Sequence, residues 1–517
     1  MTARGLPATF RHLTLSSGLR ASAARDPQKT ALIMGAERRA YSTVVANVNR
    51  TANLALALGL KAGDNAAIIS PNCMEYLEIA AGVSDIGAAL ATPNPRLTAP
   101  EIAEICNDAR ARVLFVHPDC EASVDASRLV TVEHIVHLGA EYEALKAKAS
   151  DRFTPGSVDE WATFSIPYTS GTTGKPKGVM LPHRSRTLGF LAYAAEYGIY
   201  SPDDHFLAIS PMCHGAGFAY AFATIFLGGV TEIMDRFDPE AVLTAIHGGE
   251  ITGLFTVPTH YHGIFGLEPK RLAALRGNRL RGIVANAAPL SQDAKERIVD
   301  YFGDGLLHET YGSTEAGVVT NLRPKDQLRK AKCVGLPFVG NQVRLLTEDG
   351  RQAAPGEVGE LFSSSPYMFN GYWRKPEQTA EALRDGFVSV GDMAVRDDEG
   401  FFYIVDRKKD MVITGGLNVY PREVETVLDL HPGVRESAVI GAPDPRWGEQ
   451  LIAFVAFNDG QAPSSDELIA HCRAQLAPYK LPKRFEAVDT LPRNANGKVL
   501  KTALRDLHSA RQKGQPT

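Results

Sequence analysis

The sequence predicts an α/β protein with a large N-terminal domain of parallel βαβ-type sheets plus a β-rich subdomain, and a small mobile α+β C-terminal domain. Short β-rich runs alternate with helical stretches between about residues 60 and 310. After residue 340 the rhythm changes to short strands with glycine turns. Alternating strands and helices are typical of βαβ units. The chain has 517 residues, which is too long for a single hydrophobic core, so we expect more than one domain.

The N-terminal alternation begins with a strand over 65–70 (NAAIIS) and a helix after Pro71. A helix over 101–109 then leads into a strand over 112–116. The later strands of the pattern, separated by helical stretches, cover residues 206–210, 231–234, 252–257, 282–286 and 306–312. Ligands in folds of this kind bind at the carboxyl ends of the strands. We therefore expect the chemistry in the loops that follow residues 210, 257, 286 and 311.

The C-terminal part reads differently. Segments 348–362 and 397–406 combine β-forming residues with glycine turns. The last ~110 residues contain a hairpin, a helix from Pro421, a strand near 453–457 and a helix from Ser465. This pattern predicts a small α+β domain, joined to the first near residues 406–410.

Composition limits the class of protein. The net charge of −4 argues against a nucleic-acid binder. The six cysteines form no CxxC pair, which is typical of reduced cytoplasmic thiols and not of a zinc site or a disulfide framework. The N-terminus has no apolar signal-peptide core. The longest apolar run, 216–230, is shorter than the ~20 residues that span a bilayer, so it predicts a buried helix. We expect a soluble cytoplasmic protein without an integral membrane segment.

The segment 168–178, YTSGTTGKPKG, is the first candidate for chemistry. Its glycines and hydroxyl residues offer many donors, and Lys175 and Lys177 add positive charge, so the loop is suited to bind phosphate. It is not a Walker A loop, because no GxxxxGK[ST] spacing fits. A flexible linker has a similar composition. The strand-like residues 164–169 before it and a helix from about Arg184 favour the phosphate loop over the linker.

The segment 308–317, HETYGSTEAG, is the second candidate. Tyr311 can stack on a nucleobase, and Glu315 in a turn can hold Mg²⁺ through oxygen. The alternative is a core tyrosine beside a solvated glutamate.

Two further segments contain charged residues. Asp392 is suited to accept hydrogen bonds from ribose hydroxyls, although an aspartate in a turn has the same appearance. The run 406–410 (DRKKD) is, alone, most often a solvated face. The loop 494–498 (NANGK) ends in Lys498, which by itself is an ordinary surface lysine.

Together, in this order, these segments resemble the adenylate-forming superfamily, in its acyl- and aryl-CoA synthetase branch. The resemblance covers about Thr30 to Leu504. It implies an ATP-dependent carboxylic acid–CoA ligase that works through an acyl-adenylate and releases AMP and pyrophosphate. The implied cofactors and partners are ATP, Mg²⁺, coenzyme A and a small-molecule carboxylic acid, with no nucleic acid. We expect a monomer or a homodimer.

The resemblance also implies roles for individual residues. The phosphate loop comprises Thr169, Ser170, Gly171, Thr172, Thr173, Gly174 and Lys177. The adenine-binding segment comprises Asn286, Ala287 and Ala288, in which Asn286 departs from the usual Gly or Ala. Adenine stacking falls to Tyr311 with Gly312 beside it, contact with the α-phosphate to Thr314, and the Mg²⁺-associated acid to Glu315. Ribose binding falls to Asp392 and Arg407, and contact with the substrate carboxylate and α-phosphate to Lys498, with His214 near that carboxylate.

Movement of the C-terminal domain is a further implication. Lys409 matches the family hinge, so we expect domains at 1–408 and 409–517. Rotation there would withdraw Lys498 after adenylation and bring Gly415 and Gly416 towards the pantetheine channel.

The acid is expected to bind against residues 212–220, 257–263, 285–288 and 312–318. Related adenylation domains that select α-amino acids typically place an aspartate in this region, and residues 211–220 contain none, so an α-amino acid is disfavoured. Relatives that activate diacids carry an arginine shortly after the position of 257–259, and here the sequence is His260-Tyr261-His262-Gly263. A dicarboxylate is therefore disfavoured too. The apolar and aromatic residues that remain favour a medium-chain fatty, alicyclic or aromatic acid.

Three alternatives remain open at this point. An acyl-adenylate ligase that loads a carrier protein would differ only in its thiol acceptor. A luciferase-like oxygenase would share the adenylation step and consume O₂. A non-catalytic nucleotide-binding descendant would be expected to have lost Lys498, Glu315 or the phosphate loop, and all three are present.

Overall fold

The protein is described by a computed structural model that covers residues 13–153, 158–170, 176–414, 417–458, 462–494 and 497–512. Its contacts divide the chain into two compact units. The first comprises Met1–Val343 and Ser363–Val388, and the second Arg344–Phe362 and Ser389–Thr517. This division groups residues 344–362 and 389–408 with the C-terminal residues, whereas the boundary expected from the sequence lies after residue 408. The hinge at Lys409 concerns motion and stays a prediction.

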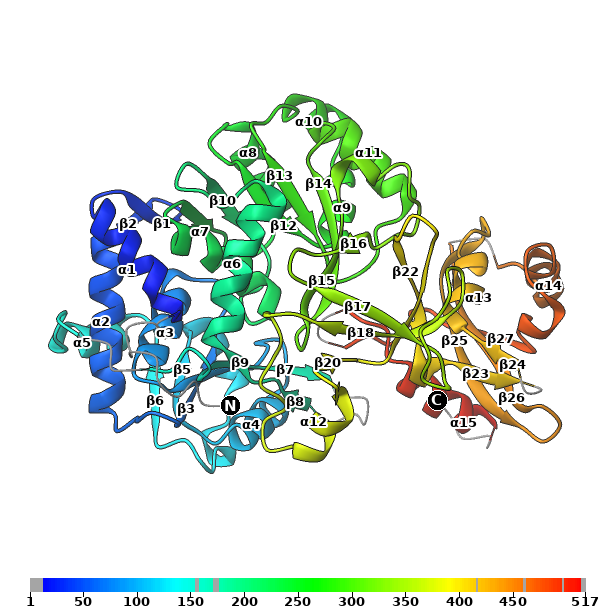
Figure 1. Ribbon diagram of the computed structural model, residues 1–517, viewed down its shortest axis with the longest axis horizontal. Helices are drawn as coiled ribbons and strands as arrows, with labels where there is room; N and C mark the ends of the chain where they lie inside the picture. The colour runs from blue at the N-terminus through cyan, green and yellow to red at the C-terminus, as the bar shows by residue number, and fades with distance from the viewer. Residues whose placement is uncertain are drawn as a thin grey trace. The chain divides into compact units, whose positions relative to one another are not determined.

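A nine-stranded sheet forms one half of the first unit (Figure 1). Its strands, in spatial order, are β16 (Leu336–Pro337), β15 (Gly317–Leu322), β14 (Leu307–Ser313), β13 (Gly282–Ala285), β12 (Gly253–Thr256), β10 (His205–Ala208), β11 (Val230–Ile233), β1 (Thr30–Met34) and β2 (Glu37–Ala40). The pairs from β14 through β13, β12, β10 and β11 to β1 are parallel. Their carboxyl ends therefore meet at one edge, as the sequence pattern predicts.

A seven-stranded sheet forms the other half. In order it contains β6 (His134–His137), β5 (Ala111–Val116), β3 (Asn65–Ile69), β4 (Ala89–Thr92), β7 (Thr163–Ser170) and β8 (Pro176–Gly178), and β9 (Leu181–Pro182) also pairs with β7. The pairs from β6 to β7 are parallel, and β7–β8 is an antiparallel hairpin. The hairpin flanks the predicted phosphate loop.

Two helices of the first unit are buried on almost every side, α3 (Met74–Asp85) and α7 (Gly215–Leu227), and most residues of α6 (His183–Tyr197) are buried too. α3 packs on β4 and β7, and α7 packs on β10 and β11, so these helices fill the space between the sheets (Figure 1). The rings of Phe164 on β7 and Phe218 on α7 meet at 6.2 Å. α7 is the helix predicted from the apolar run 216–230, and it ends at Gly228, whose φ of +97° stops it before β11.

The remaining helices of the first unit cover the outer faces. They are α1 (Leu15–Arg25), α2 (Tyr41–Ala57), α4 (Ala99–Asp108), α5 (Ala140–Lys148), α8 (Pro239–His247), α9 (Pro258–Phe265), α10 (Pro269–Ala274), α11 (Gln292–Phe302) and α12 (Pro376–Ala382). Two starts show the local cause. The carboxylate of Asp238 accepts the N–H of Ala241 to cap α8, and the hydroxyl of Ser291 accepts the N–H of Ala294 to cap α11. Two short strands, β19 (Leu383–Arg384) and β20 (Phe387–Val388), follow α12.

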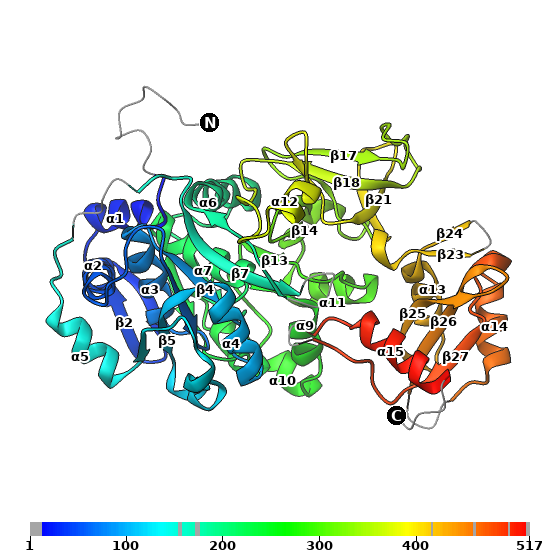
Figure 2. The ribbon, with the colours of Figure 1, turned by 90° about the horizontal axis from the view of Figure 1, so that it is seen from below.

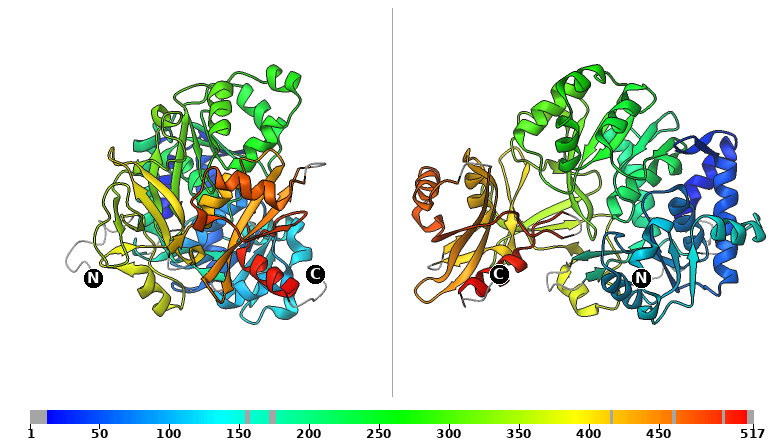
Figure 3. Two further views of the ribbon diagram at one scale, coloured as in Figure 1. Left: turned by 90° about the vertical axis from the view of Figure 1, so that its right-hand side faces the viewer. Right: turned by 180° about the vertical axis from the view of Figure 1, so that it is seen from behind.

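The second unit contains most of β17 (Gln342–Leu346) and of β18 (Gly359–Ser364), and all of β21 (Asp392–Arg396) and β22 (Phe402–Arg407), followed by the C-terminal sheet. That sheet has the order β24 (Leu417–Val419), β23 (Val412–Thr414), β26 (Gly448–Phe457), β25 (Val434–Asp444), with β27 (Arg484–Ala487) beside β26. α13 (Pro421–Leu428) and α14 (Ser465–Arg473) cover one face, and α15 (Lys501–Gln512) covers the other (Figure 2; Figure 3, left).

Side chains alternate between the two faces of the C-terminal sheet along its long strands, β25 and β26, which explains why helices cover both faces. Val439 and Val455 point into a cluster with Val424 and Leu468 of α13 and α14. Ile440 and Phe454, one residue away on each strand, point into a second cluster with Leu504 of α15. The predicted α+β C-terminal domain is confirmed. Among the described residues, no helix is long and apolar enough to cross a membrane.

Candidate active site

The β7–β8 hairpin places the residues on either side of the predicted phosphate loop. Thr169 pairs with Lys177, and Ser170 pairs with Pro176. Tyr168 anchors the hairpin by donating its hydroxyl hydrogen to Asp108 at 2.7 Å. The loop residues Gly171, Thr172, Thr173 and Gly174 lie outside the described part of the chain. Their role in binding phosphate therefore stays a prediction.

Glu315 is held in a tight turn between β14 and β15. The residue is 8% exposed, and its carboxylate accepts a hydrogen bond from the hydroxyl of Tyr372 at 2.8 Å. Its backbone carbonyl accepts the N–H of Phe369 at 2.9 Å. The turn needs Gly317, whose φ is +72° and where a Cβ would lie 2.8 Å from that of Tyr367. Glu315 is thus fixed from both its side chain and its backbone.

Tyr372 also links Glu315 to the phosphate-loop hairpin. The ammonium group of Lys177 lies 5.1 Å from the centre of the Tyr372 ring, a cation–π distance. Lys177, Tyr372 and Glu315 therefore form a continuous contact. The sequence analysis identified the two charged members and missed the tyrosine that joins them.

The donor set fits Mg²⁺ only together with a nucleotide. No cluster of three or more His, Cys, Asp or Glu side chains that could hold a metal occurs in the described ranges. Magnesium is commonly held by one or two carboxylates with substrate phosphates and waters. Glu315, hydrogen-bonded to a neutral hydroxyl, suits that arrangement.

The other predicted residues of β14 lie at its carboxyl end. Tyr311 is half-buried and pairs with Thr320, and a register shift follows it. Gly312 has no room for a side chain, because a Cβ would lie 2.2 Å from the carbonyl oxygen of Gly317. Thr314 is half-buried in the turn itself.

Asn286 has a definite structural part. Its side-chain amide donates to the hydroxyl of Thr310 at 2.7 Å, and its backbone N–H donates to the carbonyl of Thr256 at 3.2 Å. It therefore joins the ends of β12, β13 and β14. The next residue, Ala287, donates its N–H to the Asn286 side chain and adopts a φ of +75°, and both Ala287 and Ala288 are exposed. The departure from the family pattern thus has a role in fixing this edge.

The predicted acid pocket has histidines in two different settings. His214 precedes α7, is half-buried and makes no side-chain capping bond. Burial, with a smaller effect of the positive Arg96, lowers the pKa of His214. His260 instead accepts the N–H of Val257 at 3.3 Å and stacks on Phe237 at 4.4 Å, and burial lowers its pKa to about 4. His260 therefore serves the scaffold of α9.

The second unit gathers the predicted ribose and carboxylate residues. Asp392 is 4% exposed, and its Oδ1 lies 2.6 Å from Nε of Arg407, its partner across β21 and β22. The pKa of Lys498 is lowered by desolvation first and by the charge of Arg407 second, while Asp392 and Asp410 oppose the shift. Lys409 lowers it further. Lys498 therefore lies in the electrostatic range of the Asp392–Arg407 pair. Gly415 and Gly416 lie outside the described residues.

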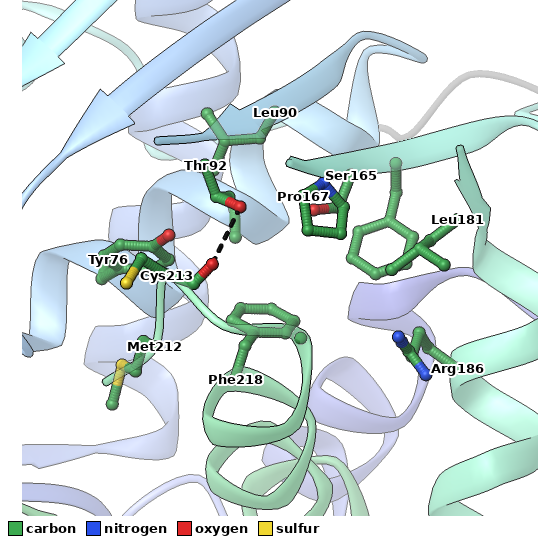
Figure 4. Close-up of a pocket in the computed structure, with 13 residues that line it drawn as sticks. Tyr76, Leu90, Thr92, Ser165, Pro167, Leu181, Arg186, Met212, Cys213 and Phe218 are labelled. Atoms are coloured by element: carbon green, nitrogen blue, oxygen red, sulfur yellow. Dashed lines mark hydrogen bonds between the residues drawn. The ribbon is translucent and has the colours of Figure 1, made fainter. Parts of the chain in front are cut away.

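The sequence analysis missed one more residue, Arg186 on α6. It borders a small cavity lined mainly by apolar side chains, among them Leu181, Met212 and Phe218 (Figure 4). Burial lowers the pKa of Arg186. The sequence pattern could have identified Arg186. One buried helical face has the spacing of Arg186, Phe190, Tyr193 and Tyr197. An arginine on such a face is unusual.

Comparisons with known proteins agree with this architecture. Residues 19–373 match the family model of the AMP-binding enzyme, and residues 423–498 match that of the AMP-binding enzyme C-terminal domain. A feruloyl-CoA synthase from Amycolatopsis sp is 38% identical over 487 residues, covering 93% of this chain and 96% of the relative. A fatty acid–[acyl-carrier-protein] ligase, ScoC, from Streptomyces coeruleorubidus is 34% identical over 493 residues, covering 94% of each.

A solved structure shows the same fold with nucleotide. The crystal structure of ATP-bound MatB from Rhodopseudomonas palustris superposes with a TM-score of 0.87 at 31% identity, covering 96% of this chain and 99% of that one. The chain belongs to the AMP-binding enzyme family and is an adenylate-forming enzyme of the acyl-CoA synthetase type.

Proposed function

We propose that the chain joins an aromatic, alicyclic or medium-chain carboxylic acid to coenzyme A at the expense of ATP. In the first step a carboxylate oxygen attacks the α-phosphorus of ATP, and pyrophosphate leaves with the bridging oxygen. In the second step the CoA thiolate attacks the acyl carbon, and AMP leaves with the electron pair of the broken C–O bond. The feruloyl-CoA synthase relative supports an aromatic acid among these classes.

The contact of Lys177, Tyr372 and Glu315 is the observation that carries the adenylation step. A carboxylate resists attack on a phosphate because both are negative, so the site must supply positive charge and fixed donors. Lys177 is suited to hold phosphate oxygens, and Tyr372 keeps Glu315 oriented. Glu315 would hold Mg²⁺, which supplies charge neutralisation at the phosphates when bound.

The proposed role of the second unit rests on its cluster of charges. The Asp392–Arg407 pair is suited to bind the ribose hydroxyls. Desolvation, which lowers the pKa of Lys498, leaves its ammonium group less tightly hydrated, and this suits a contact with the substrate carboxylate and the α-phosphate. We further propose that rotation at Lys409 removes Lys498 after adenylation, so that one site performs both steps. A cytoplasmic location and a monomeric or homodimeric state belong to the same proposal.

Lys498→Ala tests the adenylation role. We expect it to lower acid-dependent pyrophosphate release by at least about 100-fold, since the variant loses a charge aimed at the transition state. Thioester formation from a pre-made acyl-adenylate should fall far less. Lys483→Ala, an exposed lysine of the same unit, is the matched control and should change neither rate. Equal losses in the two half-reactions would remove Lys498 from this role.

The thiol acceptor is tested by an acid panel. Pyrophosphate release with Mg²⁺-ATP is followed for short, medium, alicyclic and aromatic acids, with and without CoA. Catalytic release with acyl-CoA formation supports the proposal. A stoichiometric burst that CoA leaves unchanged favours loading of a carrier protein, an alternative that the ScoC relative makes specific.

A further inference from the structure

Arg186 is a buried cation without a counterion. It lies in the first turn of α6 and is 6% exposed. Within the ranges that the structure describes, its guanidinium makes no hydrogen bond and no ion pair, and no carboxylate affects its pKa. Arginine stays protonated in proteins, and an unpaired buried charge is costly. A side chain in this state points to a partner that the chain itself does not supply.

The surroundings of Arg186 add to the positive potential. A methyl group at Gly215 would lie 3.2 Å from the Nη2 atom of Arg186 and 4.0 Å from Cγ2 of Thr314, so all three residues border one small volume. Gly215 is the first residue of α7, a 13-residue helix whose N-terminus has no side-chain cap. The free amide groups and the helix dipole there favour an anion.

A neutral hydroxyl lies on the same helix as Arg186. Tyr193 lies two turns after Arg186 on α6, is buried, and influences the pKa of Arg186 together with Tyr220. No described residue forms a hydrogen bond with the Tyr193 hydroxyl. The rings of Tyr193 and Tyr220 stack at 4.7 Å, which holds that hydroxyl in place.

The cavity beside Arg186 is lined mainly by apolar side chains, and Tyr76, Thr92 and Ser165 are polar residues of its wall. Figure 4 shows the guanidinium turned from α6 towards the space beside Phe218. The cavity encloses about 10 Å³, roughly the space of one water molecule. A larger group enters only if the lining side chains shift.

We propose that Arg186 binds a second carboxylate, carried by the acid at the end away from the reacting carboxyl group. This inference rests on the proposed ligase function. It assigns the acid to dicarboxylates whose two ends are separated by an apolar or aromatic spacer. Tyr193 and the N-terminal amides of α7 are positioned to donate further hydrogen bonds to the same group.

The chemistry favours the distal carboxylate over the reacting one. The reacting carboxylate loses its own charge when it becomes the acyl group of the adenylate, and Lys498 is already proposed to contact it. A distal carboxylate keeps its charge through both half-reactions, so the guanidinium keeps its partner throughout.

The same residue revises the expectation drawn from the sequence. A dicarboxylate was disfavoured because no arginine follows residues 257–259 on α9. Arg186 supplies the missing charge from α6, a different wall of the region around Gly215.

The test compares acids that differ only at the distal end. The pairs are hexanoate with adipate, octanoate with suberate, and cinnamate with 4-carboxycinnamate. The variants are Arg186→Met and, as matched control, Arg184→Met. Arg184 lies on the same helix but already has Glu160 as its ion-pair partner at 2.5 Å. Pyrophosphate release gives kcat/KM for each acid, and the thermal shift without ATP gives binding.

We expect the wild type to prefer the diacid in at least one pair. Arg186→Met should lower kcat/KM for that diacid by about 30-fold or more, the usual cost of removing one partner of a buried charge pair. The matched monoacid should change by less than about threefold in the same variant. Arg184→Met should keep the preference for the diacid.

Two results would overturn the inference while the ligase function stands. One is a wild type that uses no diacid better than its monoacid. The other is an equal loss for both acids in Arg186→Met, which would assign the arginine to the reacting carboxylate or to the scaffold. If no acid releases pyrophosphate, the proposed function fails, and the thermal shift decides alone. A Tm rise with a diacid in the wild type but not in Arg186→Met supports the site, and equal shifts reject it.

Discussion

Lys295 and Arg186 are both buried cations of the first unit, but they differ in whether a described carboxylate lies beside them. Lys295 on α11 is 1% exposed, and its ammonium group lies 2.5 Å from Oε2 of Glu309 on β14. The other carboxylate oxygen of Glu309 accepts the N–H of Leu290 at 3.0 Å. Arg186 between α6 and α7 is almost as buried but has no described carboxylate beside it.

The difference separates a structural charge from a charge that awaits a ligand. Burying an ion is costly in either region. At Lys295 the fold supplies the counterion, and both groups are removed from solvent in the native state itself. At Arg186 the cost is offset only when something else brings an anion. We therefore expect substitution by Met to lower the free energy of unfolding at Lys295 but not at Arg186.

Lys295→Met should show the largest effect on stability. It removes one member of a buried ion pair and leaves Glu309 charged or forces it to bind a proton, so we expect a loss of about 3–5 kcal/mol in the free energy of unfolding. Urea unfolding in a Trp447→Phe background measures this loss. The remaining tryptophans, Trp161 and Trp373, both lie in the first unit.

The double variant Lys295→Met/Glu309→Gln is the control for this result. It removes both charges, and the amide oxygen that replaces the carboxylate can still accept the N–H of Leu290. We expect it to recover part of the stability that the single variant loses. A double variant as unstable as the sum of both single changes would show that the pair is not coupled.

His183 at the start of α6 adds a third buried group, one that stays neutral. Its Nδ1 accepts the N–H of Leu15 at 2.9 Å, and burial lowers its pKa to about 3 from 6.5. In the unfolded chain the His183 imidazole binds a proton as the pH falls through about 6.5, whereas in the folded chain it stays neutral until the pH approaches 3. Stability from this group is therefore complete above pH 6.5 and is lost as the pH falls towards 3. We expect a loss of about 1.5 kcal/mol between pH 6.5 and pH 5.

His183→Gln should flatten that pH dependence, because glutamine does not titrate and its carbonyl can accept the Leu15 N–H. The same urea experiment at pH 5, 6 and 7 provides the measurement. His134→Gln, at an exposed position of β6, is the control and should keep the wild-type slope. An unchanged slope in His183→Gln would mean that the imidazole is protonated in the folded state.

Much of the fold follows from patterns that are local in sequence. A long apolar run predicts the buried helix over 216–230, and short β-rich runs that alternate with helical stretches predict the parallel strands that end near residues 210, 257, 286 and 311. The structure confirms both predictions. The boundary between the compact units is harder to predict from the sequence, because residues 344–362 and 389–408 look like any β-rich segment. Whether they pack with the N- or C-terminal residues depends on contacts that no local pattern encodes.

The candidate site likewise contains residues that the sequence predicts and residues that only the structure identifies. Asp392 and Arg407 were expected to act together, and their pairing across β21 and β22 explains why. Tyr372 was missed because it lies 57 residues after Glu315 and no local pattern marks its role. Arg186 was missed because its importance lies in an absent partner, which only a three-dimensional description of its surroundings reveals.

Arg186→Met should have the smallest effect on stability and provides the sharpest contrast with Lys295→Met. The substitution removes a desolvated charge without breaking any pair among the described residues, and the methionine side chain can follow the path of the arginine stem. We expect the free energy of unfolding to stay unchanged or to rise by about 1 kcal/mol, measured in the same Trp447→Phe background. A loss comparable to that of Lys295→Met would show that Arg186 is paired within the native fold. A neutral or stabilising result, together with loss of the diacid preference, would show that this arginine is retained at a cost in stability because the substrate is its counterion.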